Sequence, residues 1–209
     1  MKIVIFGASG KVGRQVAQEA LKRGHDITVF VHHTPPSDDP HLRIIRGDVH
    51  DKASIEQALD GQDAVICTLG SWGTKQKDIL SSAMHSIVPA MEQRGIHRIV
   101  SLTGNVAAAP NEKLSFAFIA ARTVLGKLAP KILRDSENHI AQLAASQLDW
   151  TVVRSPVMVP HGSPTYALKH TGSLLSATVN RTAVAYSLID LLESTSTEWH
   201  RQAPYIARA

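Results

Sequence analysis

Three glycines near the start of the chain have the type and spacing to hold a phosphate group. Gly7, Gly10 and Gly13 form the pattern G-x-x-G-x-x-G directly after the apolar run of residues 3–6. Glycine permits a sharp turn and lets the backbone approach a ligand closely. A helical pattern follows over residues 12–21, and a helix that begins there directs free N–H groups and a partial positive charge at the turn. These residues predict a cradle for a pyrophosphate.

The other residues of the turn fit the same interpretation. The peptide N–H groups from Ser9 to Val12 are expected to face the phosphates, and Arg14 lies in the first turn of the helix. Arg14 could reach a phosphate or remain in solvent, and both alternatives stay open. A glycine triplet alone is a weak signal, but its position between a strand and a helix makes it much stronger.

The rest of the chain alternates between strand and helix patterns, which is typical of βαβ units around a parallel sheet. Right-handed crossovers leave few topologies, of which the doubly wound nucleotide-binding sheet is the commonest. We therefore expect an α/β Rossmann fold with three αβα layers, in a single domain of residues 1–209. Strands are predicted over residues 3–6, 26–31, 42–45, 64–67, 97–102 and 150–154, and helices over 11–23, 52–59, 78–94, 113–128, 132–147 and 182–192.

Prolines suggest two local irregularities. Pro89 lies inside the helix predicted over residues 78–94, and it should kink or split that helix. Residues 156–173 contain three prolines and two glycines, so a loop is expected there. Residues 205–207 could add a last short strand.

The residues after the second and third strands bear on the choice of nucleotide. An acidic residue that holds the ribose hydroxyls is expected about 20 residues after the glycines, but His32 and His33 occupy that place. Without a carboxylate to repel a 2′-phosphate, NADP(H) is preferred, while NAD(H) stays open because the expected arginine is also missing. Asp48 could accept a hydrogen bond from the adenine amino group or serve as a turn residue.

Composition and charge narrow the function classes. The chain has 209 residues, 44% of them hydrophobic, a net charge of +4, and 22 basic residues that are scattered rather than grouped. This argues for a small anionic ligand and against nucleic acid as a partner. Cys67 is the only cysteine, which excludes an intrachain disulfide and suits a reducing cytosol.

Neither a membrane or secreted protein nor a metal-binding protein is expected. No apolar segment approaches the about 20 residues that span a membrane, and the N-terminus lacks the layout of a signal peptide, so we expect a cytoplasmic protein without a membrane partner. No metal site is expected either. The histidines at positions 32, 33, 41 and 50 are interpreted as solvated loop residues, because no cysteine or close acidic ligand completes a site.

Segments spread over most of the chain resemble those of a known family. They are GASGKVG at residues 7–13, GH at 24–25, GDV at 47–49, DAVI at 63–66, RIVS at 98–101 and LDWTVVRSP at 148–156. From residue 1 to about residue 160 the chain is similar to the atypical short-chain dehydrogenases/reductases. More narrowly, it resembles the NAD(P)H-binding proteins related to NmrA and to biliverdin reductase B, a flavin reductase.

The resemblance implies contact positions for a bound NAD(P)(H). The residues that would contact the pyrophosphate are Gly7, Ser9, Gly10, Lys11, Val12 and Gly13. His32 stands where NADP-binding relatives often have an arginine, and Asp48 and Val49 would frame the adenine. The residues that would lie along the ribose and nicotinamide are Thr68, Leu69 and Gly70.

The chain departs from the catalytically complete branch of that family. This branch has a serine after the fifth strand and a Tyr-x-x-x-Lys pair in the next helix. Here Gly104 stands at the serine position, Thr103 is the nearest hydroxyl, and residues 114–128 contain no tyrosine. Tyr166 and Lys169 have the wrong spacing for the pair. The proton relay of that branch is therefore absent.

A small substrate-side region is expected at about residues 105–130 and 155–180, and several side chains in and around it are candidates for a substrate site. The side chains that could line it are Trp72, Phe116, Phe118, Arg154, Val157, Met158 and His161. Arg154 could pair with an acidic substrate or with a structural carboxylate, and both alternatives stay open. His161 is the one of these side chains able to act as an acid near pH 7, although a solvated loop histidine is the commoner case.

These observations favour an NAD(P)H-dependent reductase of a small planar acceptor such as a flavin, a quinone or a carbonyl compound. The main alternative is a non-catalytic NmrA-like redox sensor that binds a dinucleotide and a protein partner. A nucleotide-sugar epimerase or dehydratase is disfavoured, because such enzymes use the missing Tyr-x-x-x-Lys pair. We expect a monomer or a homodimer.

Overall fold

The computed structural model describes residues 1–172 and 178–209, and its centre is a sheet of eight strands. The strand order is β3-β2-β1-β4-β5-β6-β10-β8, in which β8 alone pairs antiparallel, with β10. The strands in this order are β3 (Leu42–Arg46), β2 (Asp26–Val31), β1 (Lys2–Phe6), β4 (Ala64–Cys67), β5 (Arg98–Gly104), β6 (Asp149–Ser155), β10 (Tyr205–Ala207) and β8 (Ala167–Lys169). The doubly wound α/β prediction is confirmed.

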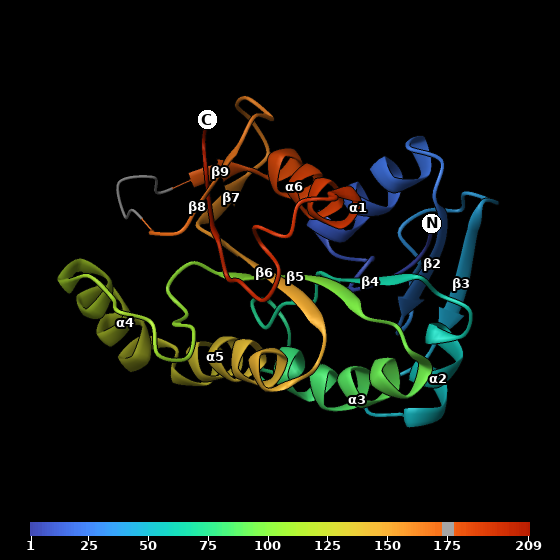
Figure 1. Ribbon diagram of the computed structural model, residues 1–209, viewed down its shortest axis with the longest axis horizontal. Helices are drawn as coiled ribbons and strands as arrows, with labels where there is room; N and C mark the ends of the chain where they lie inside the picture. Colours follow the sequence, from blue (N-terminus) through green and yellow to red (C-terminus); the bar gives the residue numbers. More distant parts are fainter. Residues whose placement is uncertain (173–177) are drawn as a thin grey trace.

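Helices cover both faces of the sheet (Figure 1). One layer consists of α1 (Lys11–Lys22) and α6 (Arg181–Glu193), which pack against each other. The other layer consists of α2 (Lys52–Leu59), α3 (Ile79–Arg94) and α5 (Pro130–Ala145), and α4 (Phe116–Leu128) lies beyond α5 at the end of this layer. None of the helices in the described part of the chain is long and apolar enough to cross a bilayer.

Alternation along the central strand divides the apolar side chains into two cores. Ile3 and Ile5 belong to the core beneath α1 and α6, whereas Val4 and Phe6 belong to the core beneath α2, α3 and α5. All four are fully buried. Successive side chains of a strand point to opposite faces, so an uninterrupted apolar run is what a strand buried on both faces requires.

Two local expectations differ from the structure. The helix around Pro89 is not split, because α3 runs from Ile79 to Arg94 and its buried residues on either side, Val88 and Ala90, keep the turn packed. The loop expected over 156–173 contains β8 and β7 (Val157–Val159), which pairs with β9 (Thr178–Asn180). These strands find their partners far along the chain, so the local proline signal was misleading. Residues 173–177 of the expected substrate-side region 155–180 lie outside the described residues.

Candidate functional site

The glycine turn between β1 and α1 is so tight that two of its positions require glycine. Gly7 has φ +83°, and a Cβ there would lie 2.6 Å from Leu69 N. A Cβ on Gly13 would lie 2.2 Å from the carbonyl oxygen of Gly7. Thr68 closes the turn from the end of β4, because its hydroxyl donates to the carbonyls of Phe6 (3.2 Å) and Gly7 (3.1 Å).

The helix after this turn begins without a side-chain cap. Its N-cap residue is Gly10, which has no side chain to accept hydrogen bonds, and the first turn of α1 contains no acidic residue. The positive end of the helix dipole therefore faces the turn, and no negative side chain neutralises it. This arrangement favours the binding of an anion. Arg14 donates from Nε to the carbonyl of Ser9 at 3.1 Å, so this arginine folds back over the turn. The residues of the cradle fit a pyrophosphate.

The residues predicted around the adenine and its ribose are brought together after β2 and β3. His32 Nε2 lies 3.5 Å from Asp48 Oδ2, and the other Asp48 oxygen accepts from the backbone N–H of His50 at 2.9 Å. Val49, the next residue in the chain, is buried. The fold thus places a carboxylate beside the end of β2, where the sequence indicated none. Asp48 is 17 residues beyond Val31 in the chain, and only the pairing of β2 with β3 brings it there.

The segment after β4, predicted to lie along the nicotinamide, is held by a residue that sequence reasoning missed. Asp135 of α5 is 2% exposed and bonds to the hydroxyl of Ser71. The same carboxylate accepts from the backbone N–H groups of Leu80 (3.2 Å) and Ser81 (2.8 Å). Asp135 therefore caps α3 from another helix, since the N-cap residue of α3 makes no cap bond of its own. No local pattern signals a cap that lies 55 residues away.

The end of β5 carries the predicted hydroxyl and the glycine that replaces the family's serine. Thr103 is 6% exposed, and its Oγ1 is buried with no hydrogen-bond partner among the described residues. A Cβ on Gly104 would meet no atom within 4 Å. Space therefore exists for a serine side chain at position 104, and the absence of the hydroxyl is not imposed by packing.

Beneath Thr103, on the same face of β5, lies a buried histidine. His139 of α5 is fully buried, and its Nε2 lies 2.8 Å from the hydroxyl of Ser101. Burial lowers the pKa of His139 from 6.5 to about 4, and the charge of Asp135 pulls in the opposite direction without offsetting it. His139 is therefore neutral in the folded protein near pH 7.

This histidine makes stability depend on acidity. Between pH 6.5 and about 4 the unfolded chain binds a proton on His139 that the folded chain does not bind, so stability falls as the pH falls through this window. We expect the free energy of unfolding to drop by about 2 kcal/mol from pH 7 to pH 5 through this group. Urea unfolding at the two pH values measures the drop. The variant His139→Gln should lose most of it, and an unchanged drop in that variant would contradict the assignment.

The four residues predicted for the substrate are not gathered around one point. Trp72, after β4, is 67% exposed, and Phe116, the first residue of α4, is 86% exposed. Met158 packs against the core of the α1 and α6 face, whereas the side chain of Arg154 turns to the α5 face. His161, the predicted acid, is exposed in the turn after β7.

Groups of the protein itself accept the hydrogen bonds of the Arg154 guanidinium. It is 3% exposed, donates to the carboxylate of Glu112 at 2.5 and 2.9 Å and to the carbonyls of Ala203 (2.8 Å) and Ala107 (3.1 Å), and lies over the ring of Tyr205. Burial alone would raise the pKa of Glu112, but the hydrogen bonds from Arg154 and from a backbone N–H outweigh it and hold this pKa below its usual value. An acidic substrate would have to displace Glu112.

Comparison with known proteins decides the family. A family model described as NAD(P)H-binding matches residues 7–195. The chain belongs to this NAD(P)H-binding family. The resemblance found in the sequence is thereby confirmed, and the glycine turn at the start of the match is the part of the fold whose geometry suits the dinucleotide.

Curated relatives match parts of the chain. The isoflavone reductase homolog IRL of Zea mays is 35% identical in an alignment of 81 residues that covers 34% of this chain and 26% of that protein. A 2-alkyl-3-oxoalkanoate reductase of Stenotrophomonas maltophilia is 29% identical in an alignment of 108 residues that covers 48% of this chain and 32% of that protein. The chain thus spans between about a quarter and a third of the length of these two relatives.

Solved structures share the fold over nearly the whole chain. A short-chain dehydrogenase/reductase of Veillonella parvula in complex with NADP has a TM-score of 0.80 at 21% identity, with 99% of this chain and 94% of that chain covered. ChuY, an anaerobillin reductase of Escherichia coli O157:H7, has a TM-score of 0.79 at 19% identity, with 100% and 97% covered. At such identities the likeness concerns the fold.

Proposed function

We propose that this protein is an NAD(P)H-dependent reductase of a small planar acceptor such as a flavin, a quinone or a carbonyl compound. The observation that carries the proposal is the glycine turn, in which Gly7 and Gly13 leave no room for a side chain and α1 presents an uncapped end. Several relatives and structural neighbours are named as reductases, which supports the same class. The remaining expectations, a single cytoplasmic domain with substrate-side regions at 105–130 and 155–180, are part of this proposal.

In this function the residues of the chain mainly bind and orient. The bound dinucleotide would supply the hydride, and the protein would hold the pyrophosphate on the glycine turn and the ribose beside Asp48. Ser71 and Asp135 would keep the segment after β4 in place against α3. Because Gly104 replaces the serine and the tyrosine relay is missing, the proposed acceptors are ones that are reduced without a protein tyrosine as the acid. Thr103 and His161 are the remaining proposed donors.

A thermal-shift titration tests the proposal. NADPH and NADH bind the native state only, so each should raise the melting temperature as its concentration exceeds its Kd. NADPH oxidation should then be followed at 340 nm with flavin mononucleotide, menadione and an aromatic aldehyde as acceptors. The absence of any shift at millimolar dinucleotide would overturn the binding part of the proposal, and binding without turnover of any acceptor would overturn the reductase part.

Nucleotide preference depends on two neighbouring groups that act in opposite directions. His32 and the absence of an acidic residue on β2 favour a 2′-phosphate, whereas the Asp48 carboxylate 3.5 Å away repels it. We propose NADP(H) as the preferred form and expect Asp48→Asn to strengthen the preference for NADPH over NADH by about tenfold, by removing one negative charge. The ratio of the two Kd values measures this, with Asp38→Asn in the neighbouring loop as the control. An unchanged ratio in Asp48→Asn would show that the 2′-phosphate binds elsewhere.

A second candidate function is a dinucleotide-dependent sensor that binds a protein partner. It is favoured by α4, whose exposed side chains include Phe116 (86%), Ile119 (50%), Val124 (56%) and Leu128 (79%). An apolar helix face of this kind is typical of an interaction surface. Equal affinity for oxidised and reduced cofactor, no turnover, and capture of a regulator only in the presence of NADP would favour the sensor. Turnover of an acceptor by Ile119→Ser and Leu128→Ser variants at the wild-type rate would show that catalysis does not need this face.

A further inference from the structure

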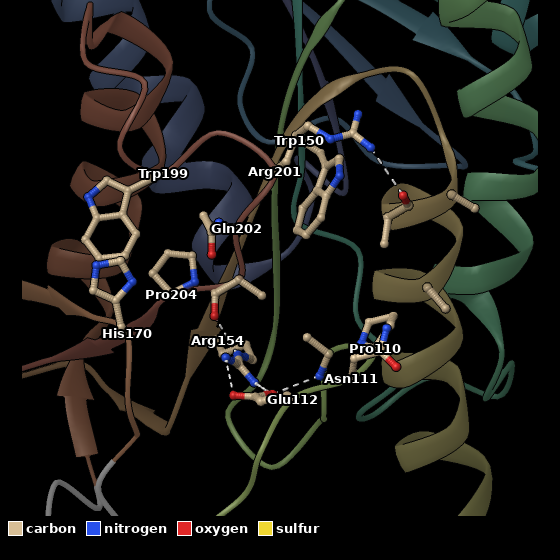
Figure 2. A pocket seen from close by; sticks show the side chains of 15 residues that line it. Pro110, Asn111, Glu112, Trp150, Arg154, His170, Trp199, Arg201, Gln202 and Pro204 are labelled. Carbon is tan, nitrogen blue, oxygen red and sulfur yellow. Dashed lines mark hydrogen bonds and ion pairs between the residues drawn. The ribbon is translucent and has the colours of Figure 1, made fainter.

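We propose that the chain has a second ligand site, separate from the glycine turn, which binds a planar aromatic molecule with an anionic group. The site is a groove of about 710 Å³ between α5 and the segment of residues 199–204, alongside β6 (Figure 2). β6 is separated from β1 by β4 and β5, so the groove lies roughly 14 Å across the sheet from the turn. Its volume is within the range of small-molecule sites.

The walls of the groove suit a flat ligand. One wall is the surface of α5 at Ala141 and Ala144, whose small side chains leave it shallow. The facing wall is formed by Pro204 and by Trp199. The ring centroids of Trp199 and His170 are 4.4 Å apart, with an angle of 32° between the ring planes. Figure 2 shows these residues across the groove from α5, with Trp150 at one end. An aromatic ring entering between the walls would contact apolar surface on both of its faces.

Backbone strain is concentrated at this groove. Among the described residues only two non-glycine residues have positive φ, Asn111 at 62° and Arg201 at 56°, and both line it. The left-handed conformation is strained for an ordinary residue, because its Cβ crowds the following carbonyl oxygen. Such strain persists where the surrounding structure holds it, and it gathers at functional sites more than elsewhere. Arg201 has no advantage of the kind that asparagine has in this conformation, so its strain is the more informative.

Among the described residues that line the groove, one cation has no carboxylate partner. Arg154 is neutralised by Glu112, and Nε2 of His170 lies 3.8 Å from a carboxylate oxygen of Glu198. Arg201 instead donates only to carbonyls, those of Ser146 and Leu148 at 3.1 Å and that of Ala144 at 3.4 Å, and no described acid pairs with it. A carboxylate, sulfonate or phosphate on the ligand would supply the missing negative charge at this end.

The tryptophan at the same end of the groove carries an unpaired donor. Trp150 is 5% exposed, and its Nε1 has no hydrogen-bond partner among the described residues. In Figure 2 this nitrogen lies on the edge of the ring that faces α5, near Arg201. A buried N–H without an acceptor costs free energy, and an anionic group held by Arg201 would place a negative charge near the tryptophan that carries this donor. The cavity, the strained arginine and the unpaired indole are independent observations that point to one ligand.

Binding of 2-naphthalenesulfonate tests the proposal without reference to the dinucleotide. Trp150 and Trp199 are two of the three tryptophans of the chain, so the probe should quench the intrinsic fluorescence, and calorimetry gives its Kd. We expect saturable binding with one site per chain, about fivefold tighter than the neutral 2-naphthol because of Arg201. Saturating NADPH should leave the Kd unchanged. No binding at millimolar probe, or equal affinity for the neutral compound, would overturn the proposal.

Two variants locate the bound probe. Ala141→Phe places a ring in the groove from an exposed position of α5. It should raise the Kd for 2-naphthalenesulfonate by at least about tenfold. Arg201→Gln should remove the preference for the anion over 2-naphthol. The control is Ala53→Phe, at an exposed position of α2 outside the groove. Equal Kd values for Ala141→Phe and Ala53→Phe would show that the probe binds elsewhere, and melting curves confirm that each variant is folded.

Discussion

Gly13→Ala will weaken the binding of NADPH by at least about a hundredfold while leaving most of the protein folded. The added Cβ would lie 2.2 Å from the carbonyl oxygen of Gly7 and 2.7 Å from the Cα of Ala8, both of which are backbone atoms. Backbone cannot rotate away as a side chain can, so the turn and the first turn of α1 must separate. Separation moves the N–H groups that would hold the pyrophosphate, because these belong to the same residues.

The measurement is the Kd for NADPH by calorimetry, with the melting temperature as a record of stability. Overpacking of this kind costs about 1–3 kcal/mol, which a domain of this size tolerates. Gly126→Ala on α4 is the matched control, because a Cβ there would make only an ordinary contact, 3.5 Å from Leu133. A Gly13→Ala variant that binds NADPH as the control does would mean that the turn is not the dinucleotide site.

Glu112→Ala will lower the free energy of unfolding by about 3–5 kcal/mol. The substitution leaves the guanidinium of Arg154, which is 3% exposed, without its counter-charge. It also removes the acceptor of the Tyr205 hydroxyl, which lies 3.0 Å from Glu112. Truncating one partner of a buried pair costs more than the pair contributes, because the other charge stays buried and unpaired.

Urea unfolding measures this loss, and Glu137→Ala is its control. Glu137 forms a comparable ion pair with Arg122, whose side chain is 44% exposed, and surface pairs contribute about 1 kcal/mol or less. The double variant Glu112→Leu with Arg154→Met should be more stable than Glu112→Ala alone, because no buried charge remains. Equal losses in Glu112→Ala and Glu137→Ala would show that the Arg154 pair is not effectively buried.

The cradle could be predicted from the sequence because its causes are local. A strand, a turn that needs glycine and a helix follow one another within the first 22 residues, and each is signalled by neighbouring residue types. The parallel sheet was predictable for a similar reason, since strands of five or so residues separated by helices permit few arrangements. The family followed from the same contiguous motifs, and the family match includes the glycine turn from Gly7 onward.

The tertiary structure alone decided which polar groups meet. Asp48 stands beside His32 because β3 pairs with β2. Asp135 caps α3 from a position 55 residues away, and Arg154 forms an ion pair with Glu112, which is 42 residues earlier in the chain. The sequence left Arg154 open between a substrate and a structural carboxylate, because the charge of a side chain does not indicate its partner.

The strands of the second half and the groove were also decided by the tertiary structure alone. β7 and β8 pair with segments that follow a proline-rich stretch, and the groove takes its lining from the loop after β5, from α5, from β6 and from the C-terminal segment. Local residue preferences act over a few positions, whereas ion pairs, trans caps and cavities arise from the packing of elements that are distant in the chain. The sequence therefore determined the glycine turn and the order of strands and helices, and the packing of α5 and the last strands decided what surrounds them.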